Sequence, residues 1–220
     1  MTMQVKNWQV QPKDLFAMGP IVPVLVINEV ADALPIAEAL LTAGINVLEV
    51  TLRTPNALDV ISAIAKELPE AVVGSGTVTN RVLLQQSYDA GAKFAISPGL
   101  TKDLLQAGDE GEIALIPGIS SISELMDGID FGYDHFKFFP AEASGGVKAI
   151  QSIGGPFPDV KFCPTGGINL NNIKKIASTG VDRVSIGMLT LPNIPANIST
   201  ISSAIAVRFL STKNSIIKFN

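Results

Sequence analysis

Short apolar segments alternate with longer amphipathic segments along the chain. Runs rich in Val, Ile and Phe are typical of buried strands, and the stretches between them are typical of helices. The predicted strands begin near Ile21, Val47, Val72, Phe94, Ile113, Phe136, Val160 and Arg183. Each interval holds about one strand, one helix and two short loops. Eight such units predict a compact (β/α)8 TIM barrel, class α/β, that forms a single domain over residues 1–220.

Polar residues at expected helix starts support these units. Asn80, Thr101, Ser121 and Asn169 stand where the side chain of a helix N-cap would accept a hydrogen bond from the backbone. One extra helix is predicted over about Val10 to Met18, ahead of the first strand. It would close the floor of the barrel.

An open doubly wound sheet is the competing architecture, because it also alternates strands and helices. Its usual fingerprint is G-x-G-x-x-G after an early strand. The nearest match, Gly74-Ser75-Gly76-Thr77-Val78-Thr79, lacks the third glycine and follows the third strand. No G-x-x-x-x-G-K-[ST] loop occurs either. The sequence therefore favours the barrel.

Composition narrows the class of protein. Apolar residues make up 47% of the 220 positions and charged residues 16%, which suits a folded core. The net charge is −4 and no basic run occurs, so nucleic acid is not expected as a partner. The apolar runs are too short to cross a bilayer, and the first fifteen residues hold no apolar signal region. With a single cysteine, Cys163, we expect a reducing, cytoplasmic setting.

The second predicted strand, residues 47–53, carries alternating charges. Glu49, Thr51 and Arg53 share one face, and the apolar residues between them share the other. The polar face should point into the barrel, where Arg53 would bind a substrate carboxylate and Glu49 would transfer protons. The alternatives are a structural Glu49–Arg53 ion pair and a solvated strand end.

A lysine lies in the sixth predicted strand between two phenylalanines. Burial of Lys137 there would favour its neutral, nucleophilic amine. A lysine that extends out of the barrel or pairs with a carboxylate is the alternative. Lys161 has a similar setting in the seventh strand, but it stands near the strand start. Lys137, which is close to the mouth, is therefore preferred.

The other strand ends add weaker signals. Thr77 and Thr165 offer hydroxyl groups, and the loop Thr165-Gly166-Gly167 could bind an anion through backbone N–H groups at a helix start. His135 is the only histidine, which makes a histidine-based metal cluster impossible. We expect His135 and Cys163 to be structural, and no metal or cofactor to be needed.

Several motifs occur in the order found in one enzyme family. The chain resembles the 2-keto-3-deoxy-6-phosphogluconate (KDPG) aldolase / 4-hydroxy-2-oxoglutarate (KHG) aldolase family from about Trp8 to Pro192. The matching segments are Val47-Leu48-Glu49-Val50-Thr51-Leu52-Arg53-Thr54, Gly76-Thr77-Val78, Phe94-Ala95-Ile96-Ser97-Pro98-Gly99, Ile116-Pro117-Gly118, Phe136-Lys137-Phe138-Phe139-Pro140-Ala141-Glu142 and Phe162-Cys163-Pro164-Thr165-Gly166-Gly167-Ile168.

The resemblance implies a metal-free class I aldolase of the Entner–Doudoroff pathway, active as a homotrimer. Such an enzyme cleaves a small 2-keto acid into pyruvate and an aldehyde, either glyceraldehyde 3-phosphate or glyoxylate. By match of motif, Lys137 would form the Schiff base and Glu49 would be the general acid–base. Arg53 and Thr77 would bind the pyruvyl carboxylate.

The resemblance also assigns the walls of the pocket. Pro98 and Phe139 would shape it, and Thr165, Gly166 and Gly167 would lie near the distal, phosphate-bearing end.

One segment departs from the family. After the eighth strand the family carries Gly-Gly-Ser, whereas this chain reads Ile186-Gly187-Met188. A methionine side chain donates no hydrogen bond, so this departure weakens the phosphate end and leaves the preferred substrate open.

Three rival functions remain open at the level of sequence. They are a metal-dependent barrel aldolase, a barrel isomerase or phosphosugar synthase, and a catalytically silent barrel that binds a small keto acid.

Overall fold

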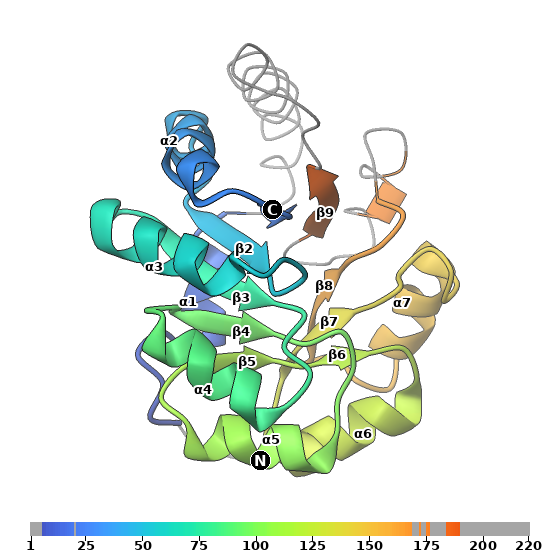
Figure 1. Ribbon diagram of the computed structural model, residues 1–220. Helices are drawn as coiled ribbons and strands as arrows, with labels where there is room; N and C mark the ends of the chain where they lie inside the picture. The colour runs from blue at the N-terminus through green and yellow to red at the C-terminus, as the bar shows by residue number, and fades with distance from the viewer. Residues whose placement is uncertain (1–5, 20, 169–171, 173–174, 177–183, 190–220) are drawn as a thin grey trace.

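A ring of parallel strands lies inside a ring of helices (Figure 1). The computed structural model describes residues 6–19, 21–168, 172, 175–176 and 184–189, without the side chains of residues 184 and 186–189. Within this part of the chain the predicted barrel arrangement is confirmed, and the open doubly wound sheet is wrong. The predicted N-cap Asn169 lies outside the described residues.

The strands begin within one residue of their predicted starts. They are β1 (Ile21–Leu25), β2 (Val47–Thr51), β3 (Val72–Gly76), β4 (Phe94–Ile96), β5 (Ala114–Ile116), β6 (Gly118–Ile119), β7 (His135–Phe138), β8 (Lys161–Pro164) and β9 (Val184–Leu189). The strand predicted from Ile113 corresponds to β5, and β6 follows it on the other side of Pro117. A proline has no N–H to donate, which interrupts the ladder there.

Two sheets make up the ring, with orders β5-β4-β3-β2-β1-β9 and β6-β7-β8. Within each sheet, every pair of neighbouring strands is parallel. At one seam the Lys137 N–H donates to the Pro117 carbonyl at 2.9 Å. At the other seam a parallel bridge pairs Thr165 with Ser185. The sheets are therefore joined at both edges, and the strand ends meet at one mouth.

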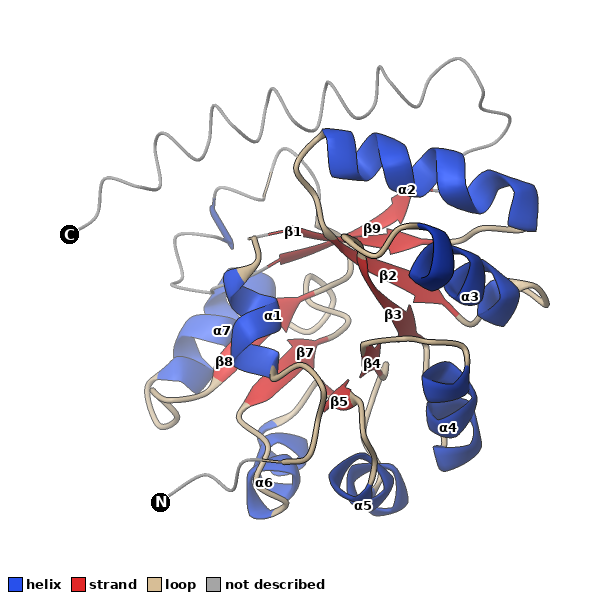
Figure 2. Cartoon of the chain, turned by 90° about the vertical axis from the view of Figure 1, so that its left-hand side faces the viewer, coloured by secondary structure: helices blue, strands red, loops and turns tan. Residues whose placement is uncertain are grey.

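Helices surround the strands, as Figure 2 shows in a view from the end of the barrel at which the N-terminal helix lies. They are α1 (Pro12–Ala17), the short 3-10 helix η1 (Val30–Asp32), α2 (Ala33–Thr42), α3 (Ala57–Glu67), α4 (Arg81–Asp89), α5 (Lys102–Glu110), α6 (Ile122–Asp130) and α7 (Gly146–Gly154). Three of the predicted N-caps are confirmed: Asn80, Thr101 and Ser121 each accept a hydrogen bond from a backbone N–H three residues on. None of the described helices is long and apolar enough to cross a membrane.

The predicted N-terminal helix is present as α1, somewhat shorter than expected. Its buried Phe16 meets His135 edge to face, with ring centroids 4.7 Å apart. Since His135 is the first residue of β7, α1 lies at the N-terminal ends of the strands and covers the floor, as predicted.

Glycines on β3 make room for large side chains inside the barrel. A Cβ atom on Gly74 would stand 2.5 Å from the ring of Phe94, which is 1% exposed. A side chain at position 74 would therefore displace the aromatic ring that fills the lower interior.

Candidate active site

A cavity of about 530 Å³ opens at the C-terminal ends of the strands, which is where barrel enzymes carry their sites. Its lining residues are Val24, Glu49, Thr51, Arg53, Thr77, Pro98, Lys137, Phe139, Thr165, Gly166, Gly167 and Ile168. All nine residues that the sequence placed at the site line this one cavity.

Strand ends bring most of these residues together. Thr77, Phe139 and Thr165 are the first residues after β3, β7 and β8. Arg53 and Pro98 stand two residues after β2 and β4. Parallel strands of a barrel all end at one rim, so residues distant in the sequence surround one space.

Lys137 and Glu49 form the innermost part of the cavity. The Lys137 Nζ atom lies 3.3 Å from Glu49 Oε1. Lys137 is 6% exposed and Glu49 is fully buried. The Phe139 ring centroid lies 5.3 Å from the same Nζ, which shields it further from water. An amine and a carboxyl group thus share a desolvated wall that faces the cavity.

The Glu49 carboxyl group is only partly satisfied. Its Oε2 atom is buried and, among the described residues, has no hydrogen-bond partner. A buried polar atom without a partner costs free energy, and such costs in a cavity commonly accompany function. Glu49 thus contributes to the cavity wall a carboxyl group with hydrogen-bonding capacity that the described residues leave unused.

Gly76 leaves the space that Glu49 occupies. A Cβ atom at position 76 would stand 2.3 Å from Glu49 Oε1 and 2.8 Å from its Cγ. Any larger residue would push the carboxylate away from Lys137.

Arg53 does not pair with Glu49, so the structural ion pair considered as an alternative is wrong. Glu49 pairs with Lys137 instead. The Arg53 Nε–H donates to the Thr51 hydroxyl at 3.1 Å, and the exposed side chain lines the mouth of the cavity. Within the described part of the chain no carboxylate forms an ion pair with Arg53.

Thr77 has a backbone conformation that threonine rarely adopts. Its φ angle is +62°, and it is the one non-glycine residue with positive φ among those described. A β-branched residue in this region costs about 1–3 kcal/mol. Strain of this kind collects at sites where a side chain must point in a particular direction, and Thr77 lines the cavity.

The loop from Thr165 to Gly167 closes the far side of the cavity. Its carbonyls at Thr165 and Gly166 accept hydrogen bonds from the backbone N–H groups of Ala141 and Glu142, at 2.7 and 3.1 Å. A Cβ atom on Gly167 would stand 2.7 Å from Glu142 Cβ, so the loop packs closely on the segment that follows β7. The start of the helix predicted after this loop lies outside the described residues.

The departing segment 186–188 lies within β9, where Ile186 pairs with Pro23 of β1. The structure does not describe the side chains of this segment.

Lys161, the second lysine considered, and the expected structural residues His135 and Cys163 do not line the cavity. Lys161 begins β8 and is the register partner of His135, the first residue of β7, so it lies nearer the floor than Lys137. The His135 Nδ1 atom lies 2.6 Å from an Asp134 carboxylate oxygen. Cys163 is buried, and its sulfur lies 3.2 Å from the Ser185 hydroxyl.

Three lining residues were given no role from the sequence: Val24, Thr51 and Ile168. The sequence could have predicted Thr51 as a lining residue, because it shares the inward face of β2 with Glu49. Val24 pairs with Glu49 across β1 and β2, but β1 is apolar throughout and shows no alternation. Ile168 follows the glycine loop and has no distinguishing pattern.

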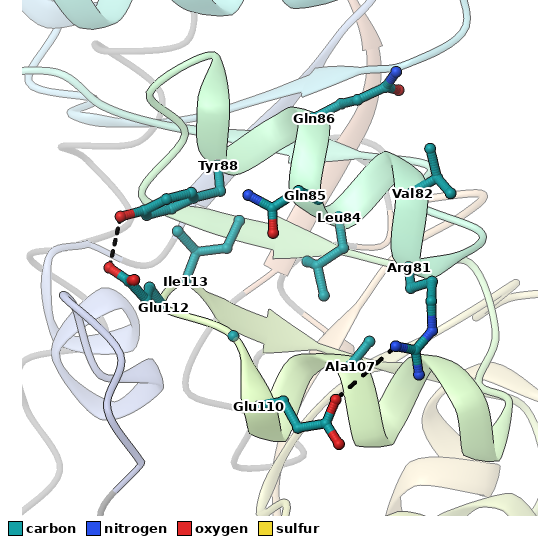
Figure 3. A pocket seen from close by; sticks show the side chains of 11 residues that line it. Arg81, Val82, Leu84, Gln85, Gln86, Tyr88, Ala107, Glu110, Glu112 and Ile113 are labelled. Atoms are coloured by element: carbon teal, nitrogen blue, oxygen red, sulfur yellow. Dashed lines mark hydrogen bonds and ion pairs between the residues drawn. The ribbon is translucent and has the colours of Figure 1, made fainter.

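A second hollow, of about 490 Å³, lies on the outside of the barrel between α4 and α5 (Figure 3). Its charged groups are already paired. The Arg81 guanidinium contacts Asp103 at 2.8 Å and Glu110 at 3.9 Å, and the Tyr88 hydroxyl donates to Glu112 at 2.6 Å. This groove holds none of the residues that the sequence singled out for chemistry.

The sequence and the fold both match characterised aldolases. Residues 13–192 match the KDPG and KHG aldolase family. The 2-dehydro-3-deoxy-phosphogluconate aldolase of Pseudoalteromonas atlantica is 63% identical over 188 residues, which cover 86% of this chain and 87% of the relative. The KHG/KDPG aldolase of Escherichia coli K12 is 58% identical over 170 residues, 77% of this chain and 80% of the relative.

A solved structure agrees. The KDPG aldolase of Legionella pneumophila, with pyruvate captured at low pH as a covalent carbinolamine intermediate, is 47% identical. The two chains superpose with a TM-score of 0.84 over 93% of this chain and 98% of the other. The chain belongs to the KDPG and KHG aldolase family.

Proposed function

We propose that this protein is a class I aldolase that cleaves 2-dehydro-3-deoxy-6-phosphogluconate, 4-hydroxy-2-oxoglutarate or both to pyruvate and an aldehyde. The observation that carries the proposal is the buried pair of Lys137 Nζ and Glu49 Oε1, 3.3 Å apart in the wall of an open cavity. Pyruvate bound covalently to a relative that is 47% identical supports the same chemistry.

Lys137 is the proposed nucleophile. Its amine attacks the C2 ketone of the keto acid and forms a carbinolamine, and loss of water leaves a cationic imine. The imine withdraws electrons from the C3–C4 bond. A covalent intermediate thus divides one difficult cleavage into several easier steps.

Glu49 is the proposed proton carrier. Its carboxyl group first protonates the leaving hydroxyl of the carbinolamine and later accepts the proton of the C4 hydroxyl as the C3–C4 bond breaks. The aldehyde leaves, and the remaining enamine takes a proton at C3. Hydrolysis then releases pyruvate and the free Lys137 amine. Both transfers involve atoms next to the imine, and Glu49 Oε1 lies 3.3 Å from the Lys137 amine.

The substrate carboxylate is proposed to bind at the mouth. The Arg53 guanidinium offers a two-pronged contact and the Thr77 hydroxyl a further hydrogen bond. Pro98 and Phe139 form apolar walls that hold the reacting carbons beside Lys137.

The distal end of the substrate is proposed to lie against Thr165, Gly166 and Gly167. Because Ile186-Gly187-Met188 replaces the donors that the family resemblance implies there, the proposal includes the unphosphorylated substrate beside the phosphorylated one.

Reductive trapping tests the assignment of the nucleophile. The protein is incubated with pyruvate and sodium borohydride, and the adduct is located by peptide mass spectrometry. We expect reduction of the imine to label Lys137 and to block aldol cleavage. Lys161 is a built-in control, since it lies in the neighbouring strand but at the floor. Labelling of Lys161, or of no lysine, would contradict the proposal.

The proposal extends to the whole molecule as a homotrimer of single-domain barrels over residues 1–220, working in the cytoplasm. The family resemblance supports the trimer, and a sequence with a single cysteine suits a reducing compartment.

A further inference from the structure

We infer that the Thr51 hydroxyl is a positioning group that fixes the Arg53 guanidinium for the carboxylate of the keto acid. The inference rests on the proposed function, since it takes Arg53 as the carboxylate-binding residue. It adds Thr51, which the family motif leaves without a role.

A chain of two hydrogen bonds connects Arg53 to the barrel wall. The Arg53 Nε–H donates to Thr51 Oγ1 at 3.1 Å, and the Thr51 hydroxyl donates to the Leu25 carbonyl at 2.9 Å. Thr51 is 1% exposed and belongs to β2, while Leu25 belongs to β1. The exposed arginine is thus anchored on two adjoining strands.

The direction of these bonds matters. A hydroxyl has one proton, and Thr51 gives it to the Leu25 carbonyl, so a lone pair of the oxygen is left for Arg53. A neighbouring donor such as Arg53 Nε–H is the group that suits this lone pair. The hydroxyl therefore selects the orientation of the guanidinium plane.

The remaining end of the guanidinium is the useful one. With Nε held by Thr51, the two terminal Nη groups stay available for a two-pronged contact with a carboxylate. A free arginine side chain has many rotamers, and restricting them before binding lowers the entropy cost of binding. Loss of the anchor should therefore weaken binding more than it slows the chemical steps at Lys137.

The chain provides a matched control close by. The Thr54 hydroxyl donates to the carbonyl of Ile27, which follows β1, at 2.8 Å. The Asn56 side chain donates to the Asn28 carbonyl at 2.7 Å. These contacts tie the loop after β2 to the loop after β1, next to the Thr51 contact that joins the two strands. Of the two threonines, Thr51 is the one that also accepts a hydrogen bond from Arg53.

The experiment compares Thr51→Val, Thr51→Ser and Thr54→Val in the full-length protein. For each variant, kcat and KM are measured for the keto acid, together with Kd for pyruvate. We expect Thr51→Val to raise KM and Kd roughly tenfold with kcat within about twofold, because preorganisation of Arg53 is lost. Thr51→Ser keeps the hydroxyl and should restore both values, and Thr54→Val should leave them near those of the unaltered protein.

The substitution Thr51→Val is also made in a protein that carries Arg53→Lys, which distinguishes a loss of the Arg53 contact from an effect on folding. Lysine has no Nε–H donor for Thr51, so in Arg53→Lys the change Thr51→Val should add no further rise in KM. An equal rise in both backgrounds, or the same rise with Thr54→Val, would overturn the inference. An unchanged KM in Thr51→Val would do the same.

Borohydride trapping separates the two proposals. If the unaltered protein is labelled at Lys137 by pyruvate and Thr51→Val binds normally, the inference on Thr51 fails and the aldolase function stands. If the unaltered protein is not labelled, the proposed function itself fails.

Discussion

Two lysines are buried to the same degree at opposite ends of the barrel. The Lys6 side chain is 7% exposed and the Lys137 side chain 8%. Lys6 contacts the end of α5 and the residue after α6, where the chain approaches the floor, while Lys137 faces the mouth. Equal burial thus occurs in two different settings.

The Lys6 ammonium group is surrounded by partners. It forms an ion pair with Asp109, donates to the Phe131 carbonyl at 3.1 Å and lies 4.6 and 5.5 Å from the ring centroids of Tyr133 and Trp8. These contacts occupy the donors of the group and hold the side chain in place.

The Lys137 amine has a carboxyl oxygen at 3.3 Å, one aromatic ring nearby and a cavity before it. The comparison teaches that burial alone does not mark a reactive lysine. A lysine whose partners fill its surroundings holds the fold together, and one that faces an open cavity can react.

Replacement of each lysine by methionine should separate these two roles, and it has the largest expected effect. Lys137→Met should lower kcat for aldol cleavage at least about 1,000-fold, because no amine remains to form the imine. Lys6→Met should leave kcat within about twofold and lower the free energy of unfolding by about 1–2 kcal/mol, since half-exposed Asp109 and two rings lose their cation.

Steady-state kinetics and urea unfolding of the two variants provide both values, with circular dichroism as the check on folding. A fall in kcat for Lys6→Met as deep as that for Lys137→Met would break the comparison.

The next effect concerns the space beside Glu49. Gly76→Ala should lower kcat by about 100-fold, because the new Cβ atom would stand 2.3 Å from Glu49 Oε1 and turn the carboxylate away from Lys137. Gly99→Ala, also near the mouth, is the matched control, since its Cβ atom would meet nothing within 4 Å. Steady-state kinetics with the keto acid measure kcat for both variants. Equal kcat values would contradict the prediction that Gly76 keeps the Glu49 carboxylate beside Lys137.

The smallest effect compares two carboxylates near the mouth. Among the described residues, one oxygen of Glu49 has no hydrogen-bond partner. Glu124, in contrast, accepts four hydrogen bonds in the capping box of α6. Partial burial favours the protonated Glu124 carboxyl group, but the N–H and hydroxyl donors of Ser120 and Ser121 outweigh it and lower its pKa. Glu124 should therefore contribute to stability and not to catalysis.

The lowered pKa of Glu124 determines how its contribution to stability changes with pH. The stabilisation by Glu124 is fully present above its unfolded-state pKa, near 4.5, and is lost as the pH falls through the lower folded-state value. Glu124→Gln should cost about 0.5 kcal/mol at pH 7, after allowance for solvent screening, and less at pH 3. Urea unfolding at both values measures this difference, which should not grow towards low pH, and kcat at pH 7 should be unchanged.

Much of the fold was predictable because each strand is a short apolar run bounded by polar residues. All eight predicted strand starts agree with the structure to within one residue. The N-caps at Asn80, Thr101 and Ser121 were predictable for a similar reason, since a cap depends on residues only three positions apart. The two-residue strand β6 after Pro117 was not predicted, because so short a segment has no periodic pattern of its own.

The sequence predicted which residues line the candidate site better than it predicted which of them contact each other. Alternation along β2 placed Glu49 and Thr51 on the inward face, and strand depth favoured Lys137 over Lys161. The same pattern allowed a Glu49–Arg53 pair, which is wrong, because a pattern along one strand does not say what faces it across the barrel.

The sequence by itself determined the eight strand–helix units, the inward polar face of β2 and a lysine near the end of β7, since these depend on local spacing and on which side chains avoid water. Only the tertiary structure decided that Lys137 meets Glu49, 88 residues earlier in the chain, that Gly76 leaves room for that carboxylate, and that Thr51 holds Arg53. The physical reason is closure of the sheet: register and curvature set which inward side chains meet across the interior, and neither is a property of any one segment.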